Sequence, residues 1–127
     1  MGRKKKGRKL SRRGLVKRAD AAFGAYIKAR DKGTCPFCRK RPVKCYFHVV
    51  SAGQYATRWD PQNVVGACNG CNFRMNFNSA PFHYGYIKER GLGLWCDVVE
   101  RSMQPAKFSN AQLLDIEAYF KGKLAEL

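Results

Sequence analysis

Two Cys-x₂-Cys pairs constrain this 127-residue chain more than any other feature. The first pair is Cys35 and Cys38, the second is Cys68 and Cys71, and 29 residues separate Cys38 from Cys68. Four thiolates at this spacing can complete one tetrahedral Zn²⁺ site. Such a site pins the two ends of the intervening segment together. We therefore expect a metal-clamped loop that presents its side chains at fixed positions.

The charge of the chain is strongly positive. It has 25 Lys and Arg against 9 Asp and Glu, a net charge of +16, and ten of the basic residues lie in the first 18 positions. A run of this density repels itself, so we expect a disordered basic arm over residues 1–16 and one domain over 17–127. Such an arm can serve solubility or localisation, but the basic body behind it favours a nucleic-acid partner. The predicted phosphate contacts in the arm are Lys4, Lys5, Lys6, Arg8, Arg12 and Arg13.

The rest of the composition indicates in which cellular compartment the protein is expected. No stretch reaches the 18 apolar residues of a membrane span, and the basic N-terminus lacks the apolar segment of a secretory signal. We therefore expect an intracellular protein with no membrane partner, in which paired cysteines bind metal more often than they form disulfides. Cys45 and Cys96 are left over, and we expect both to be small buried hydrophobes.

The pattern of apolar residues predicts an α+β fold of helix, hairpin and further helices. A β-branched and aromatic run predicts a strand, and a short second strand follows a loop. Ser109 with Gln112 three residues on forms the capping box of the last helix. The predicted elements are a helix over 15–31, a strand over 43–50, a loop over 51–62, a strand from Val64 into Cys68, and helices over 72–78, 81–90, 93–103 and from Ser109 onward.

Inside the clamped segment lie His48 and Asn63, and Asn72 follows the second cysteine pair at once. A strand, loop, strand and short helix clamped by zinc resembles the ββα-metal finger of the HNH (His-Me finger) nucleases, in the H-N-N form. The resemblance implies that His48 is the general base and that Asn72 is a ligand of a catalytic Mg²⁺ or Mn²⁺. It also implies that Asn63 holds the loop that orients His48. These residue types suit phosphodiester hydrolysis, because imidazole accepts a proton near neutral pH and a hard cation prefers oxygen ligands.

A closer resemblance is to the phage recombination endonucleases of the NinG (Rap) type, and a more distant one is to endonuclease VII, a Holliday-junction resolvase. It runs from about Lys17 to the C-terminus and includes Ala22-Phe23, Tyr26 through Asp31, and Tyr55 with Arg58-Trp59. It implies an endonuclease that cuts branched or recombination-intermediate DNA, such as a Holliday junction or flap, in the cytoplasm of a host cell. Two coordinated cuts would require a symmetric dimer. The apolar helices after residue 80 either form that dimer surface or complete a monomer core.

The sequence departs from the family at the second metal ligand. Many members carry an acidic residue one or three positions before the histidine, where this chain has Phe47 and Cys45. Three interpretations stay open: another oxygen, with Asp60 the nearest acid, completes the site; the metal has fewer protein ligands; or activity is weak. Two other functions are a non-catalytic zinc-clamped DNA-binding module and a nicking endonuclease that assists DNA packaging.

Several further residues in the body are candidates for DNA contacts. Arg58 and Arg74 are predicted to contact phosphates, and Tyr55 and Trp59 could stack on a sugar or base. Aromatic residues in a small domain more often belong to the core. His83 has no matching partner spacing, so we expect it to be a core or helix-surface histidine.

Overall fold

The computed structural model describes residues 10–127, so the predicted arm contacts Lys4, Lys5, Lys6 and Arg8 lie outside the described residues. The chain is α+β, as predicted, with one two-stranded sheet among the described residues. Its elements are α1 (Arg12–Arg30), β1 (Cys45–His48), α2 (Tyr55–Arg58), the 3₁₀ helix η1 (Pro61–Asn63), β2 (Val64–Ala67), α3 (Asn69–Met75), α4 (Ala80–Arg90), α5 (Leu92–Ser102) and α6 (Asn110–Ala125).

The first helix begins earlier than the sequence predicted. Ser11 caps it, with its hydroxyl accepting a hydrogen bond of 3.0 Å from the backbone N–H of Gly14. Arg12 and Arg13 consequently lie in the first turn of α1 and not in an arm that extends to residue 16. The cap satisfies a backbone donor that would otherwise lack a partner, which explains why the helix extends into the basic run.

The two strands form an antiparallel hairpin in which His48 lies opposite Val64 and Cys45 lies opposite Ala67. The first strand is shorter than the predicted 43–50, because Val49 and Val50 turn away from the ladder and bond to Asn63. The loop predicted over 51–62 contains two short helices, α2 and η1. The hairpin therefore ends at His48, and a structured loop returns the chain to the second strand.

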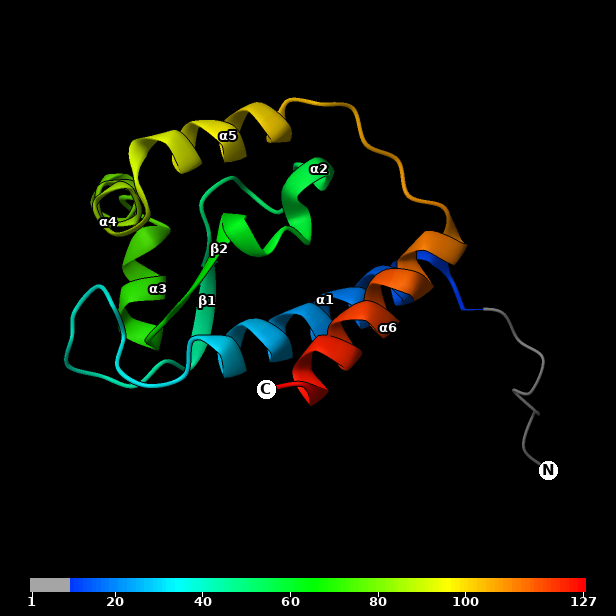
Figure 1. Cartoon of the computed structure of the whole chain (residues 1–127), viewed down its shortest axis with the longest axis horizontal. Coiled ribbons are helices and arrows are strands. Elements are labelled where there is room, and N and C mark those ends of the chain that lie inside the picture. Colours follow the sequence, from blue (N-terminus) through cyan, green and yellow to red (C-terminus); the bar gives the residue numbers. More distant parts are fainter. Residues whose placement is uncertain (1–9) are drawn as a thin grey trace.

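The hairpin packs on both of its faces. Because side chains alternate along a strand, Phe47 and Val65 share one face, and His48 and Val64 share the other. Phe47 and Val65 belong to a buried cluster with residues of α3 and α4, whereas Val64 belongs to a second cluster with residues of α1 and α6. Figure 1 shows this layering, with α3, α4 and α5 to one side of the hairpin and α1 and α6 to the other.

The later helices agree with the sequence within one to three residues. Gly91, at φ 98°, ends α4 in the left-handed region that glycine tolerates best. The predicted capping box of Ser109 and Gln112 opens α6. Helices α1 and α6 lie side by side (Figure 1) and join through the rings of Phe23 and Phe120, whose centroids are 4.9 Å apart. These contacts enclose the second cluster.

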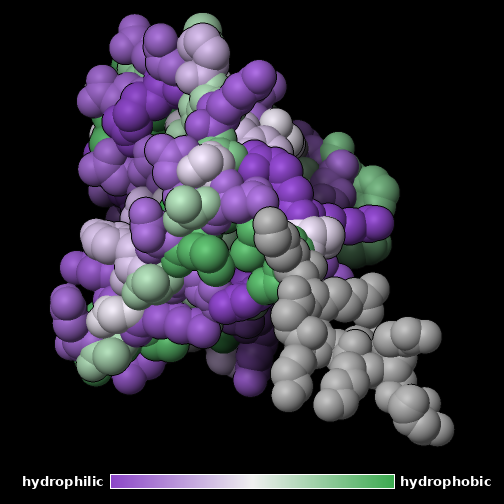
Figure 2. Space-filling view, turned by 90° about the vertical axis from the view of Figure 1, so that its right-hand side faces the viewer, coloured by the Kyte–Doolittle hydropathy of each residue, from purple (hydrophilic) through white to green (hydrophobic). Residues whose placement is uncertain are grey.

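Figure 2 views the molecule from the right-hand side of Figure 1, where hydrophilic residues predominate and hydrophobic ones gather near the centre of the face. Within residues 10–127, no helix has both the length and the apolar character that crossing a membrane requires.

Candidate metal centre and histidine loop

The fold brings the four predicted metal ligands together. The sulfur atoms of Cys35, Cys38, Cys68 and Cys71 all lie within 4.8 Å of one another, and all four thiols are free. The Sγ atoms of Cys38 and Cys68 are 3.7 Å apart. A tetrahedral Zn²⁺ site with Zn–S bonds of about 2.3 Å requires sulfur atoms about 3.8 Å apart. The four thiols therefore fit one tetrahedral ion such as Zn²⁺.

Local backbone structure positions each cysteine pair. In the first pair, Arg39 adopts a left-handed φ of 58°, and this tight turn lets the N–H of Lys40 donate to Cys38 Sγ at 3.4 Å. In the second pair, Cys68 is the N-cap of α3, and its Sγ accepts from the N–H of Cys71 at 3.3 Å. A metal ion bound by the four thiols would thus fix the start of α3.

The electrostatics of the four thiols favour a cation. Backbone N–H groups of Lys40 and Arg41 lower the pKa of Cys38 to about 6. Burial and the neighbouring sulfur atoms raise the pKa of Cys71 to about 12. The cluster alone cannot carry four negative charges in so small a volume. A divalent ion removes this conflict and makes four thiolates favourable.

His48 is held at the end of β1 by a single polar contact. Its Nε2 lies 3.0 Å from the carbonyl oxygen of Arg58. A carbonyl only accepts, so Nε2 carries the hydrogen and, in the neutral ring, Nδ1 carries the lone pair. Burial lowers the pKa of His48. The arrangement therefore presents a neutral imidazole whose Nδ1 can accept a proton.

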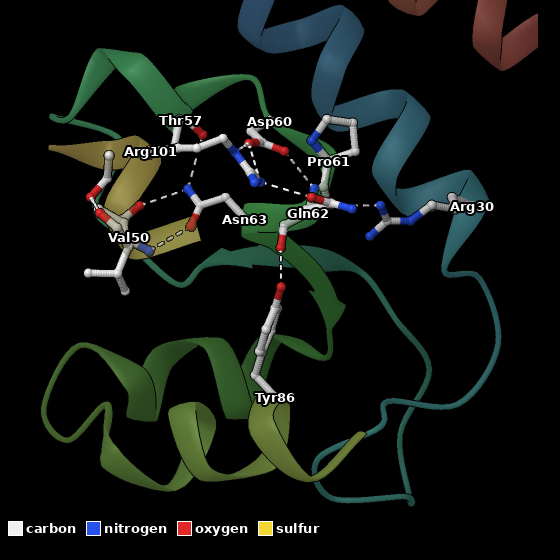
Figure 3. Close-up of polar contacts among 11 residues, drawn as sticks. Arg30, Val50, Thr57, Asp60, Pro61, Gln62, Asn63, Tyr86 and Arg101 are labelled. Carbon is white, nitrogen blue, oxygen red and sulfur yellow. Dashed lines mark hydrogen bonds and ion pairs between the residues drawn. The ribbon is translucent and has the colours of Figure 1, made fainter. Parts of the chain in front are cut away.

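Asn63 is fully buried and connects the two segments that flank His48 (Figure 3). Its side-chain oxygen accepts from the N–H of Val50 at 2.7 Å, and its amide donates to the carbonyls of Val50 and Thr57, each at 3.0 Å. Val50 follows the strand that carries His48, and Thr57 precedes the Arg58 carbonyl. Asn63 therefore fixes the loop geometry around His48, while its part in a reaction stays a prediction.

Two candidate residues of the loop, Asp60 and Arg58, form hydrogen bonds and ion pairs within the fold. Asp60 accepts from the N–H of Gln62 at 2.9 Å through Oδ1 and pairs with Arg101 at 2.8 Å through Oδ2, as Figure 3 also shows. Two internal contacts thus hold the Asp60 carboxylate, and its part in a metal site stays a prediction. Arg58 forms two hydrogen bonds to Asp20, at 3.0 and 2.7 Å, and donates to the carbonyl of Ala52. An internal ion pair therefore holds the Arg58 guanidinium, and a phosphate contact by this residue stays a prediction.

The predicted aromatic contacts lie inside the fold. Trp59 is buried, and its indole N–H donates to Asp20 at 2.9 Å. Tyr55 is half-buried, with its ring centroid 5.7 Å from that of Trp59 and 5.0 Å from the guanidinium carbon of Arg58. Both residues are part of the packing of α2.

The predicted metal ligand Asn72 lies on α3, half-buried. That helix packs against the Phe47 face of the hairpin, whereas the ring of His48 lies 6.3 Å from that of Phe23 on α1. Contacts among the described residues therefore do not join His48 to Asn72. Arg74, also on α3, is exposed and donates to Cys71 Sγ at 3.2 Å.

The remaining histidine and cysteines have structural surroundings. His83 accepts the indole N–H of Trp95 through Nδ1 at 3.0 Å, and burial lowers its pKa. Cys45 is half-buried, but Cys96 is exposed, so the predicted burial of Cys96 is wrong. Its position on the outer face of α5 follows from how that helix packs, which the residue type alone does not reveal.

Sequence reasoning missed Asp20 and Arg30. Asp20 holds Arg58 and Trp59, and Arg30 donates to the carbonyls of Pro61 and Val64 at 3.0 and 2.7 Å. Both lie on the predicted first helix, and no local pattern indicates partners more than 30 residues away.

Comparisons with protein-family models, with curated proteins and with solved structures found no match for this chain. Its function is therefore argued from its own residues and their contacts.

Proposed function

We propose that this chain is a metal-dependent DNA endonuclease of the HNH type that hydrolyses phosphodiester bonds in branched or recombination-intermediate DNA. The observation that carries the proposal is the hydrogen bond of 3.0 Å between His48 Nε2 and the Arg58 carbonyl. It assigns the ring hydrogen to Nε2 and leaves Nδ1 as a proton acceptor. The net charge of +16 supports DNA as the partner.

His48 would act as the general base. Nδ1 takes a proton from the water that attacks phosphorus, and the ring becomes positively charged. The Arg58 carbonyl then stabilises the imidazolium, because its negative end faces Nε2–H. Asn63 maintains this contact by tying Val50 to Thr57, next to Arg58. The geometry thus orients the base without a carboxylate partner on the imidazole.

Asn72 would hold a Mg²⁺ or Mn²⁺ through its amide oxygen, the kind of ligand that hard cations prefer. The ion would stabilise negative charge that builds on the phosphate. The Zn²⁺ of the four thiolates is structural, since it has no open coordination position. Because no contact joins Asn72 to His48, the roles of these two residues require separate tests. A symmetric dimer also stays a prediction.

A second candidate function is a non-catalytic zinc-clamped DNA-binding module. It is favoured by the absence of an acid at positions 45 and 47, which are Cys and Phe, and by the pairing of the nearby carboxylates, Asp20 with Arg58 and Asp60 with Arg101. In this case the same fold binds DNA and leaves it intact.

The test is incubation of the purified chain with a synthetic four-way junction and a matching duplex, with or without added Mg²⁺, in buffer free of chelator. An endonuclease cuts the junction only with Mg²⁺. His48→Gln keeps a donor for the Arg58 carbonyl and removes the Nδ1 base, so we expect the cleavage rate to fall about 10²–10⁴-fold with DNA binding unchanged.

The matched control is His83→Asn, which keeps an acceptor for the Trp95 indole and should cleave normally. Asn72→Ala should be inactive and partly rescued by higher Mg²⁺ or Mn²⁺. Binding without cleavage by the wild-type chain would establish the second candidate function. An active His48→Gln beside an inactive His83→Asn would place the reaction elsewhere.

A further inference from the structure

The outer face of α3 carries an exposed aromatic pair. Phe73 and Phe77 have 62% and 76% of their surfaces exposed, and their ring centroids lie 5.1 Å apart in an edge-to-face arrangement. Two exposed rings in contact form a contiguous apolar surface, and its burial by a partner is favourable. The pair therefore marks an interaction surface, which neither the zinc centre nor His48 explains.

The backbone holds this pair in place. On the inner side of α3, Cys71 and Met75 are buried in the cluster that contains the four thiols. Beyond the helix, the N–H of Phe77 donates to the Arg74 carbonyl at 3.0 Å, which continues the turn and keeps Phe77 beside Phe73. The metal centre thus anchors the helix from inside, and the two rings project from a rigid support.

The polar groups around the pair indicate the partner. In the sequence Arg74 lies between the two phenylalanines; it is exposed, with one guanidinium N–H donating to Cys71 Sγ, and Asn76 and Asn78 are also exposed. Residues 61–88 contain no Asp or Glu. A second copy of this chain would bring another strongly positive surface against this one, which Coulomb repulsion opposes. Aromatic rings, a cation and amides without acids instead match a nucleobase with its phosphate, through stacking, charge and hydrogen bonding.

We propose that Phe73 and Phe77 form a stacking surface for unpaired nucleobases, through which the chain distinguishes DNA with unstacked bases from continuous duplex. This inference rests on the proposed DNA-directed function and adds the source of its structural preference. In a continuous duplex the bases are stacked on one another and cannot cover the rings. At a junction or bulge the unpaired bases can, while Arg74 contacts the adjacent phosphate.

The test uses a duplex with a three-nucleotide bulge that contains 2-aminopurine, and the same duplex without the bulge, in buffer free of Mg²⁺ and chelator. The wild-type chain should bind the bulged DNA more tightly and quench 2-aminopurine. Stacking of one base on an aromatic ring is worth about 5- to 140-fold in affinity. The Phe73→Ala/Phe77→Ala variant should lose that factor and the quenching, with less than about a twofold change for duplex.

Three matched variants complete the design. Phe73→Tyr/Phe77→Tyr should retain the quenching, because it keeps both rings. Phe73→Leu/Phe77→Leu should lose it, because it keeps apolar area without a ring. Tyr119→Ala removes another exposed aromatic, 58% exposed on α6, and should change nothing. The substituted phenylalanines are exposed, so zinc content should stay at the wild-type value in all variants.

Retained preference and quenching in the double alanine variant would overturn this inference alone. Equal loss of binding to both DNAs, together with conversion of a dimer to a monomer in sedimentation, would make the pair a dimer contact and also overturn it. A wild-type chain that binds neither DNA would overturn the proposed function itself.

Discussion

The two faces of the hairpin are held by different physical means. On one face lies the zinc-side cluster, which contains the four thiols and apolar side chains packed with them: Cys35, Cys38, Phe47, Cys68, Cys71, Met75, Phe82 and Tyr86. On the other lies the helix-side cluster of ordinary apolar packing: Leu15, Ala19, Phe23, Ile27, Trp59, Val64, Leu113 and Phe120. We expect the first cluster to depend on a cation that neutralises its sulfur atoms, whereas the second needs only the removal of apolar surface from water.

The proposed functional groups are divided between the two faces of the hairpin. His48 lies on the helix side, near Phe23 and Tyr46, and its orientation depends on backbone contacts of the loop. Asn72 and Phe73 lie on α3, and Phe77 follows it; the N-cap of this helix is Cys68, one of the four thiols that could bind a metal. Loss of metal should therefore affect the two sets of groups unequally.

Metal removal should produce the largest effect on stability. Structural zinc contributes about 10–16 kcal/mol of apparent binding free energy in small zinc-dependent domains. Chelation, or the Cys35→Ser/Cys71→Ser variant, should therefore release the ion and unfold the zinc-side cluster. Hydrogen exchange should show lost protection for amides of α3 and α4, with protection retained in α1 and α6. Metal analysis of the wild-type chain should find one zinc ion.

The matched control is Cys45→Ser, which changes a cysteine of the same hairpin that is not in the thiol cluster. It should keep its zinc and its exchange pattern. Uniform loss of protection over all helices on chelation would show that the two clusters unfold as one unit, which contradicts the comparison.

A cavity in the helix-side cluster should lower the stability by less than metal removal does, and it should leave zinc binding unchanged. Leu113 on α6 is fully buried in the helix-side cluster. Leu113→Ala should lower the free energy of unfolding by about 2–5 kcal/mol, because it removes apolar contacts and leaves a cavity. Urea denaturation measures the loss, and zinc content should not change. Leu114→Ala is the control, since Leu114 is 44% exposed on the same helix. Zinc loss in Leu113→Ala would show that the helix side supports the metal centre.

The features that the sequence predicted correctly are local in the chain. The capping box depends on Ser109 and Gln112, three residues apart, and each cysteine pair closes a tight turn of its own. Local chemistry also predicted the hairpin and the α+β class. The sequence also predicted that the two cysteine pairs meet, because a structural Zn²⁺ ion prefers four ligands around it.

The features that it could not predict depend on distant partners. Arg58 is a residue type that commonly contacts phosphate, yet its guanidinium forms an ion pair with Asp20, 38 residues away. Asp60 was a candidate metal ligand, but Arg101 occupies one of its oxygens. The opposite placement of His48 and α3 also depends on strand register and on which helix covers each face. Such pairings are decided by tertiary packing, because each residue type suits several roles.

The two histidines provide the smallest effect and a direct comparison between the faces. His48 lies on the helix side and His83 on the zinc side, and burial lowers the pKa of each. Their stabilising contribution is complete above the unfolded pKa of about 6.5, where both rings are neutral in both states. As the pH falls from 6.5 through the folded pKa values, the unfolded chain takes up protons first, so the free energy of unfolding decreases.

A difference of one pKa unit corresponds to about 1.4 kcal/mol. We expect His48→Gln and His83→Asn each to reduce the loss of stability between pH 7.5 and 5, measured by thermal melting with zinc content followed in parallel. If His48→Gln leaves the pH dependence at the wild-type value while His83→Asn reduces it, the folded chain protonates His48 as readily as the unfolded chain does, which contradicts a pKa lowered by burial.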